Sequence, residues 1–264
     1  MKISAHTKRI LTSVLLLPLI IWVVFWGGSL GIHLLVLVVS FLGVWEFLSL
    51  FELTYGPLFL LKCTGLILTI PLVFSDYLHI SPLFLLIGCF WILNLCFLFS
   101  YGGGGGWKWT YFQLVFLSLV YIPLVLHFFV YLSPWEIFYV VGLAFISDTC
   151  AFYVGSRWGK KRLWPVISPK KSWAGAWGSM GGAVIFSLLC AIPLLSYSWY
   201  KALFLGILLN LCAQIGDLFE SAIKRYLEVK DAGNLLPGHG GMLDRIDSLL
   251  FVSAMYFILG SMVR

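Results

Sequence analysis

Apolar runs long enough to cross a membrane recur along almost the whole of this chain of 264 residues. A transmembrane helix needs roughly 20 mainly apolar residues, and a helix satisfies its own backbone hydrogen bonds where no water is available. The runs lack the alternation of polar and apolar residues that marks a membrane barrel. Nine spans are predicted, at residues 10–26, 30–51, 57–75, 80–100, 110–132, 136–156, 173–196, 200–218 and 247–263.

The composition agrees with this pattern, because 61% of the residues are apolar and only 11% are charged. A soluble domain usually has ~25% charged residues. The predicted fold is an all-α polytopic membrane protein with about nine transmembrane helices. It forms one integral membrane domain over residues 1–264, with N-terminal spans in 1–135 and the polar, catalytic half in 136–264.

The basic residues predict an orientation. With a cytoplasmic N-terminus, fifteen of the seventeen lysines and arginines face the cytoplasm, and only Lys201 and Arg264 lie outside. This bias matches the positive-inside rule and predicts active-site loops on the cytoplasmic side. The net charge of +6 suits membrane lipids or anionic substrates. Nucleic-acid binding is not expected, because the basic clusters are short and carry no recognition motif.

The most polar segment lies between the last two spans. Residues 217–247 hold ten of the 28 charged side chains (17 basic and 11 acidic). On a helix, Asp217, Glu220, Ser221 and Lys224 share one face. Such a face could hold a metal ion and the phosphate that it bridges, or it could form only intrahelical ion pairs. Ionisable groups at a membrane edge favour the functional interpretation.

Three nearby groups extend this candidate site. Asp244 and Asp247 form a second acidic pair, so Asp217 and Asp244 could share Mg²⁺, or the pair could cap the last helix. A glycine-rich turn at 237–241, with His239, could bind an anion through backbone N–H groups or be an ordinary turn. The 168–172 segment offers two lysines and two serines for phosphate or for membrane topology.

Glu46 lies inside the predicted second span. It could be a relay or an ion site, or it could lie near the interface with Glu52. The sequence leaves these alternatives open.

The residues from Ser221 to Asp247 resemble the signature of the phosphatidate cytidylyltransferases, also called CDP-diacylglycerol synthases. The matching positions are Ser221, Lys224, Arg225, Lys230, Asp231, Pro237, His239, Gly240, Gly241, Asp244, Arg245 and Asp247. The upstream segment also resembles the family, at Asp148, Thr149, Gly155, Gly159 and Ser168 to Lys171. The chain departs from the family pattern at Cys150, Ser172 and Ala174, and Ala174 replaces a usual glutamate.

The resemblance implies that CTP and phosphatidate react to give CDP-diacylglycerol and pyrophosphate, with Mg²⁺ as cofactor, at a bacterial inner membrane. A homodimer is compatible with the sequence. We expect Asp217 and Asp244, with Glu220 and Asp247 nearby, to hold Mg²⁺. The charges of the substrates would be neutralised or the reaction assisted by Lys224, Arg225, Lys230, Asp231 and Arg245. The substrates would be bound by Asp148, Ser168, Lys170, Lys171, Ser221, His239, Gly240 and Gly241.

The main alternative is a polytopic transporter or ion-pathway protein, which the many spans and Glu46 also suit. Transporters commonly place their sites at the membrane midplane within repeated halves. In this chain the polar block lies at one predicted membrane edge and no internal repeat is found. A phosphatidylalcohol transferase would carry the pattern D-G-x₂-A-R…G-x₃-D-x₃-D, which is not present.

Overall fold

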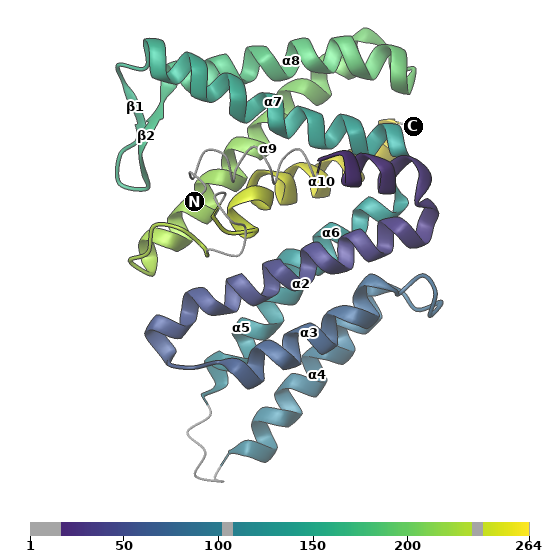
Figure 1. Ribbon diagram of the computed structural model, residues 1–264, viewed down its shortest axis with the longest axis vertical. Coiled ribbons are helices and arrows are strands. Elements are labelled where there is room, and N and C mark those ends of the chain that lie inside the picture. Colours follow the sequence, from purple (N-terminus) through teal and green to yellow (C-terminus); the bar gives the residue numbers. More distant parts are fainter. Residues whose placement is uncertain (1–16, 102–107, 234–239, 264) are drawn as a thin grey trace, which may run out of the picture. The chain divides into compact units, whose positions relative to one another are not determined.

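The computed structural model describes residues 17–101, 108–233 and 240–263, and most of them lie in helices (Figure 1). In chain order these elements are a short helix Leu17–Trp26, α2 Gly28–Tyr55, α3 Phe59–Val73, α4 Pro82–Ser100, α5 Trp109–Leu119, the π-helix η1 Val120–Leu124, α6 Val125–His127, the 3₁₀ helix η2 Phe128–Tyr131, α7 Pro134–Trp158, α8 Trp173–Leu195, α9 Trp199–Tyr226 and α10 Leu243–Val263.

Six helical segments of the described residues are long and apolar enough to cross a membrane. They are Gly28–Glu52, Pro82–Ser100, Trp109–Tyr131, Pro134–Trp158, Trp173–Leu195 and Trp199–Tyr226. The helix Leu17–Trp26 and α3 are apolar but shorter, and α10 carries Asp244, Arg245 and Asp247 in its first turns. The predicted helical, polytopic architecture is confirmed, and the count of nine spans stays a prediction.

The chain forms two compact units. The N-terminal unit comprises the described residues of Met1–Val130 and Asp231–Asp244, and the C-terminal unit comprises those of Tyr131–Lys230 and Arg245–Arg264. In the N-terminal unit, α3 packs against α2 and α5. Gly65 allows a close approach there, because an added Cβ would lie 3.1 Å from a methyl of Val44 and 3.4 Å from one of Leu48.

In the C-terminal unit, short polar sequences set where the helices begin. Ser133 and Glu136 form a reciprocal capping box at the start of α7, with Pro134 in the first turn, a combination that satisfies N–H groups left free at a helix N-terminus. Ser172 caps α8 by accepting a hydrogen bond from the Gly175 N–H at 3.2 Å. Its side chain has the capping role expected of a serine or threonine.

Helices α7 and α8 lie along each other in the same unit (Figure 1). Glycines on α8 permit this approach, since a Cβ added to Gly178 would collide with Val154 and one added to Gly182 would collide with the sulfur of Cys150. Small residues at such positions let helix backbones pack closely in membranes. This packing brings the ends of α7 and α8 together.

A short antiparallel hairpin connects α7 to α8. Strand β1 (Arg162–Trp164) pairs with β2 (Ser168–Ser172), with Arg162 opposite Ser172 and Trp164 opposite Ser168. The sequence predicted only a polar loop here. The hairpin is the one sheet among the described residues, and it carries the lysines of the 168–172 segment.

Candidate active site

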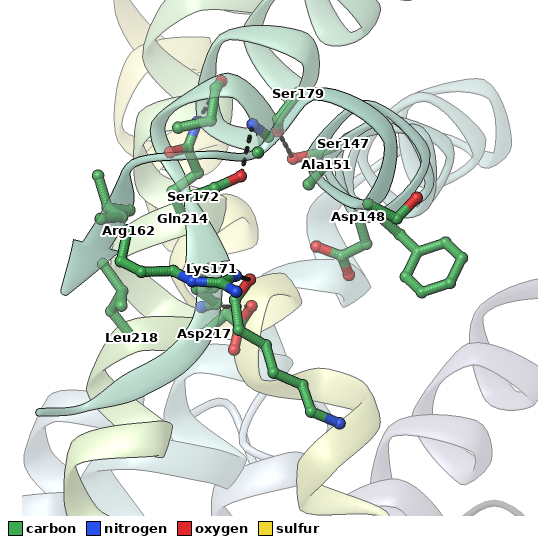
Figure 2. A pocket seen from close by; sticks show the side chains of 18 residues that line it. Ser147, Asp148, Ala151, Arg162, Lys171, Ser172, Ser179, Gln214, Asp217 and Leu218 are labelled. Atoms are coloured by element: carbon green, nitrogen blue, oxygen red, sulfur yellow. Dashed lines mark hydrogen bonds and ion pairs between the residues drawn. The ribbon is translucent and has the colours of Figure 1, made fainter. Parts of the chain in front are cut away.

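A pocket of about 500 Å³ lies among α7, α8 and α9 of the C-terminal unit, beside the β1–β2 hairpin (Figure 2). Its volume is within the ~300–1,000 Å³ usual for small-molecule sites. Its polar lining side chains are Ser147, Asp148, Ser156, Arg162, Lys170, Lys171, Ser172, Ser179, Gln214 and Asp217. The three cations among them suit an anionic ligand, and the two carboxylates suit a cation.

The hairpin is attached to α9 by an ion pair inside this pocket. The ammonium of Lys171 on β2 lies 2.5 Å from Oδ2 of Asp217 on α9. Successive side chains of a strand point to opposite faces, and Lys170 is accordingly exposed while Lys171 is half-buried. The structure thus brings together Lys171 and Asp217, which the sequence placed in two separate polar segments.

Two further carboxylates lie near Asp217 in the same unit. Helices α9 and α10 approach closely at Gly216, where an added Cβ would lie 2.6 Å from the backbone oxygen of Asp247. Asp148 lines the same pocket as Asp217. Figure 2 shows Asp148 on α7 across the pocket from Lys171 and Asp217. The pocket is therefore lined by two carboxylates, Asp148 and Asp217, and Asp247 lies on the neighbouring helix α10.

This donor set fits a particular kind of metal site. Within the described residues, no cluster of three or more His, Cys, Asp or Glu side chains has the arrangement of a metal cage. Mg²⁺ commonly takes one or two carboxylates and completes its shell with waters and substrate phosphates. The hard oxygens of Asp217 and its acidic neighbours therefore fit an ion shared with a phosphate ligand, and do not fit an all-protein cage.

The predicted polar face of α9 contains two side-chain pairs, each four residues apart. The Ser221 hydroxyl donates to Oδ1 of Asp217 at 3.5 Å, and the Lys224 ammonium donates to Oε2 of Glu220 at 2.9 Å. Glu220 is fully buried. The intrahelical pairs that the sequence offered as the simpler explanation are thus present, and Asp217 remains the member of the face that lines the pocket.

A buried polar network that was not predicted from the sequence lies next to the pocket. The Asn210 amide donates to the hydroxyls of Ser147 and Ser179 at 2.8 and 2.7 Å, and these hydroxyls are 2.8 Å apart. The Gln214 amide donates to Oδ1 of Asn210 at 2.6 Å. Helical spacing could have indicated this network, because Asn210 and Gln214 lie seven and three residues before Asp217, on the same face of α9.

The segment before α10 belongs to the N-terminal unit and is organised by Asp244. Its Oδ2 atom accepts hydrogen bonds from the N–H groups of Ala232 and Gly241, each at 3.1 Å. Gly240 has a φ of +82°, a conformation that glycine adopts readily. Pro237 and His239 lie outside the described residues. Asp217 and Asp244 belong to different units, so their joint binding of Mg²⁺ stays a prediction.

The remaining predicted residues lie around the end of α9. The Arg225 guanidinium donates to the backbone oxygens of Ile167 at 3.2 Å and Val229 at 3.3 Å, which connects the hairpin turn to α9. Ser168 lies in β2 opposite Trp164. The exposed members of the predicted set in this region are Arg225, Lys230, Asp231 and Arg245. Arg162, which was not among the predicted site residues, also lines the pocket.

Together, the fold and the pocket define an integral membrane protein with a cation-lined polar site at the ends of its apolar helices. The chain belongs to the cytidylyltransferase family, because the family model matches residues 7–263. The resemblance found in the signature residues is therefore confirmed, and it extends over both halves of the chain.

Curated relatives agree. The chain is 30% identical to the phosphatidate cytidylyltransferase of Brucella suis, over 96% of this chain and 92% of that protein. It is 40% identical to the phosphatidate cytidylyltransferase of Bacillus subtilis, over 54% of this chain and 56% of that protein. A similar match to the phosphatidate cytidylyltransferase of Staphylococcus haemolyticus is 41% identical and covers 47% of this chain and 48% of that protein. The two higher identities thus fall in matches that span about half of each chain.

Proposed function

We propose that this chain transfers CMP from CTP to phosphatidate, producing CDP-diacylglycerol and pyrophosphate in phospholipid biosynthesis. The observation that carries the proposal is the match to the cytidylyltransferase family over nearly the whole chain. Relatives named phosphatidate cytidylyltransferase supply the substrates. The pocket around Lys171 and Asp217 supports the same conclusion.

Both proposed substrates are anions, so charge neutralisation is the first task of the site. Arg162, Lys170 and Lys171 line the pocket and would bind phosphate oxygens. Lysine serves as a point charge, whereas arginine can form two parallel hydrogen bonds. Further cations in the predicted set are Lys224, Lys230 and Arg245. Such groups hold two anions together that would otherwise repel each other.

The reaction itself is a displacement at phosphorus. A phosphate oxygen of phosphatidate attacks the α-phosphorus of CTP and forms the new P–O bond. The bond between the α-phosphorus and the α,β-bridging oxygen breaks, and its electrons leave with pyrophosphate. A phosphate monoester has its second pKa at ~6, so the nucleophile is already mostly a dianion at neutral pH. The residues therefore need to position the substrates more than to remove a proton.

We further propose that Mg²⁺ binds at Asp217, with Asp247 on the neighbouring helix close by and Asp244 as the partner expected from sequence. When bound, the ion would neutralise phosphate charge. In the structure, the Lys171 ammonium forms an ion pair with the Asp217 carboxylate. It would move toward a phosphate oxygen when a cation takes its place beside the carboxylate.

The proposed location is the inner membrane of a bacterium, with the pocket on the cytoplasmic face. The distribution of lysine and arginine supports this orientation, and CTP is a cytoplasmic nucleotide. Membrane lipids would surround the apolar helices, and phosphatidate would arrive from the same bilayer. A homodimer is proposed only as an arrangement that the chain permits.

The test is an assay of the purified full-length protein in lipid vesicles with CTP and phosphatidate. We expect pyrophosphate release that requires both substrates, and a CDP-lipid product identified by mass. Diacylglycerol in place of phosphatidate is the matched control, because it lacks the attacking phosphate. Release of pyrophosphate without phosphatidate, or no CDP-lipid with both substrates, would overturn the proposal and reopen the transporter alternative.

A further inference from the structure

We propose that Glu46, on helix α2, is a positioning residue that holds the described parts of the signature segment, residues 231–233 and 240–244, in their working shape. The proposal deepens the proposed function, because that segment carries Gly240, Gly241 and Asp244 of the predicted site. The sequence left the role of Glu46 open between an ion relay and an interfacial residue. The contacts of its carboxylate favour neither alternative and indicate a third role.

The first contact is a hydrogen bond across 197 residues of sequence. Oε2 of Glu46 accepts from the N–H group of Leu243 at 2.8 Å. Leu243 is the first residue of α10, where N–H groups have no partner within the helix. A negative side chain is also favoured at this end by the helix dipole. Glu46 thus acts as an N-terminal cap that comes from another helix.

The second contact is steric and involves two glycines of the signature segment. A Cβ added to Gly233 would lie 2.6 Å from Oε1 of Glu46, and a Cβ added to Gly241 would lie 2.7 Å from Oε2. Glu46 itself is 2% exposed. The backbone at Gly233 and at Gly241 therefore packs directly against the Glu46 carboxylate, and only glycine fits at these two positions.

The third link connects this packing to the predicted site. The N–H group of Gly241, whose Cα lies against Glu46, donates to Oδ2 of Asp244 at 3.1 Å, and Ala232 donates to the same atom. Glu46 and Asp244 thus both contact the backbone around Gly241, Glu46 by packing and Asp244 by a hydrogen bond. If Glu46 is removed, Leu243 loses its acceptor and the glycines lose the group that sets their position. Asp244 and the Gly240–Gly241 backbone should then shift.

Kinetics of Glu46→Ala and Glu46→Gln test the inference. Glutamine keeps an oxygen for the Leu243 N–H, whereas alanine removes it. We expect Glu46→Ala to raise the KM for CTP or phosphatidate at least about tenfold, because small displacements of substrate-binding groups are costly. Glu46→Gln should stay within about threefold of the unchanged protein, since it still accepts the hydrogen bond. KM is the decisive quantity, because partial unfolding alone lowers the amount of active enzyme and leaves KM unchanged.

Glu52→Ala is the matched control. Glu52 lies on the same helix and is also paired, with Lys62 at 2.6 Å and the Leu58 N–H at 3.0 Å, but its contacts are in the connection between α2 and α3. We expect it to change stability without changing KM. An unchanged KM in Glu46→Ala, or equal KM changes in Glu46→Ala and Glu52→Ala, overturns the proposal.

A measurement without substrate separates this inference from the proposed function. Hydrogen–deuterium exchange of the peptide that covers residues 240–250 should become about tenfold faster in Glu46→Ala, because the Leu243 N–H loses its acceptor and local opening becomes easier. Unchanged exchange there overturns the positioning role. Failure of the unchanged protein to make a CDP-lipid would overturn only the proposed function.

A double-mutant cycle tests the contact itself. Gly233→Ala introduces a Cβ whose nearest neighbours are all atoms of the Glu46 side chain. It should raise KM in the unchanged background and add little to Glu46→Ala, because the colliding group is then gone. Gly181→Ala, where an added Cβ meets nothing within 4 Å, controls for the loss of glycine. Additive effects of Gly233→Ala and Glu46→Ala would show that the two residues do not act through their contact.

Discussion

The Lys171 ammonium and the Asp217 carboxylate, 46 residues apart in sequence, lie 2.5 Å from each other in the pocket. This contact joins a hairpin that carries cations to the helix that carries the acidic residue of the predicted metal site. A charge on Asp217 can therefore be neutralised in two ways, by Lys171 or by a bound cation. Competition between the two would couple metal binding to the release of a phosphate-binding lysine.

Lys171→Gln should strengthen cation binding while it weakens substrate binding. Without the competing ammonium, we expect Asp217 to bind Mn²⁺ about three- to tenfold more tightly in the substrate-free protein, by Coulomb interaction in a partly screened pocket. The KM for CTP should rise in the same variant. A titration followed by electron paramagnetic resonance measures the Mn²⁺ affinity. Lys160→Gln is the control, because Lys160 is exposed and lies outside the pocket lining, and unchanged or weaker Mn²⁺ binding in Lys171→Gln would contradict the competition.

Asp217→Asn should lower kcat at least about 100-fold, since it removes both the charge that would hold Mg²⁺ and the partner of Lys171. Asparagine is close in size, so membrane insertion and the thermal midpoint should change little. The measurement is CDP-lipid synthesis at limiting Mg²⁺, with Glu228→Gln as a control at an exposed position near the same end of α9. Near-normal synthesis would remove Asp217 from the metal site.

Asp244→Asn should also stop turnover, and its exchange behaviour should differ from that of Glu46→Ala. Asparagine retains one oxygen that can accept from Gly241 or Ala232, so the loop should keep its shape while the charge is lost. We expect slow deuterium exchange at residues 240–250 together with a loss of kcat of at least about 100-fold. Full activity with unchanged exchange would leave Asp244 as a loop-organising residue alone.

Removal of divalent cations should abolish activity reversibly. EDTA is expected to reduce CDP-lipid synthesis to background, and added Mg²⁺ should restore it, because the site offers too few protein ligands to retain the ion without its substrate. The effect should appear without a change in helical circular dichroism. Full synthesis after exhaustive chelation would exclude a metal requirement.

Asn210→Ala should destabilise the C-terminal unit by about 1–3 kcal/mol, because the hydroxyls of Ser147 and Ser179 and the amide of Gln214 would lose a buried partner. Thermal unfolding of the detergent-solubilised protein measures this. Asn94→Ala is the control: Asn94 also hydrogen-bonds through its side chain, to the Phe90 oxygen and Trp109, but these contacts are exposed. Equal midpoints for the two variants would show that the network contributes nothing to stability.

The sequence predicted what depends on local pattern. Apolar length indicated the membrane helices, and helical spacing placed Asp217 on the face of α9 that lines the pocket. The spacing allows intrahelical ion pairs as one of two interpretations, and the Glu220–Lys224 pair is present, but the spacing does not show that Glu220 is fully buried. The family could be predicted as well, because its signature is a run of residue types at fixed spacings, from Ser221 to Asp247.

What the sequence could not predict depends on contacts between distant residues. The β1–β2 hairpin forms when Arg162 pairs with Ser172 across a turn. No alternation of apolar and polar residues in the sequence indicates these strands. Asn210 and Gln214 give no charge signal, because they are amides inside an apolar run, although both lie on the same helix face as Asp217. The role of Glu46 depends on Leu243, which lies 197 residues away in the sequence. In the fold, the Leu243 nitrogen lies 2.8 Å from Oε2 of Glu46.

The sulfur of Cys150 faces Gly182 with no room for another carbon between them. The family resemblance implies glycine or alanine at position 150, where this chain has cysteine, so positions 150 and 182 should vary together. Homologous sequences with glycine or alanine at 150 are free to carry alanine or serine at 182, whereas those with a larger residue at 150 should keep glycine there. The summed side-chain volume at positions 150 and 182 should therefore vary less among homologues than either residue alone.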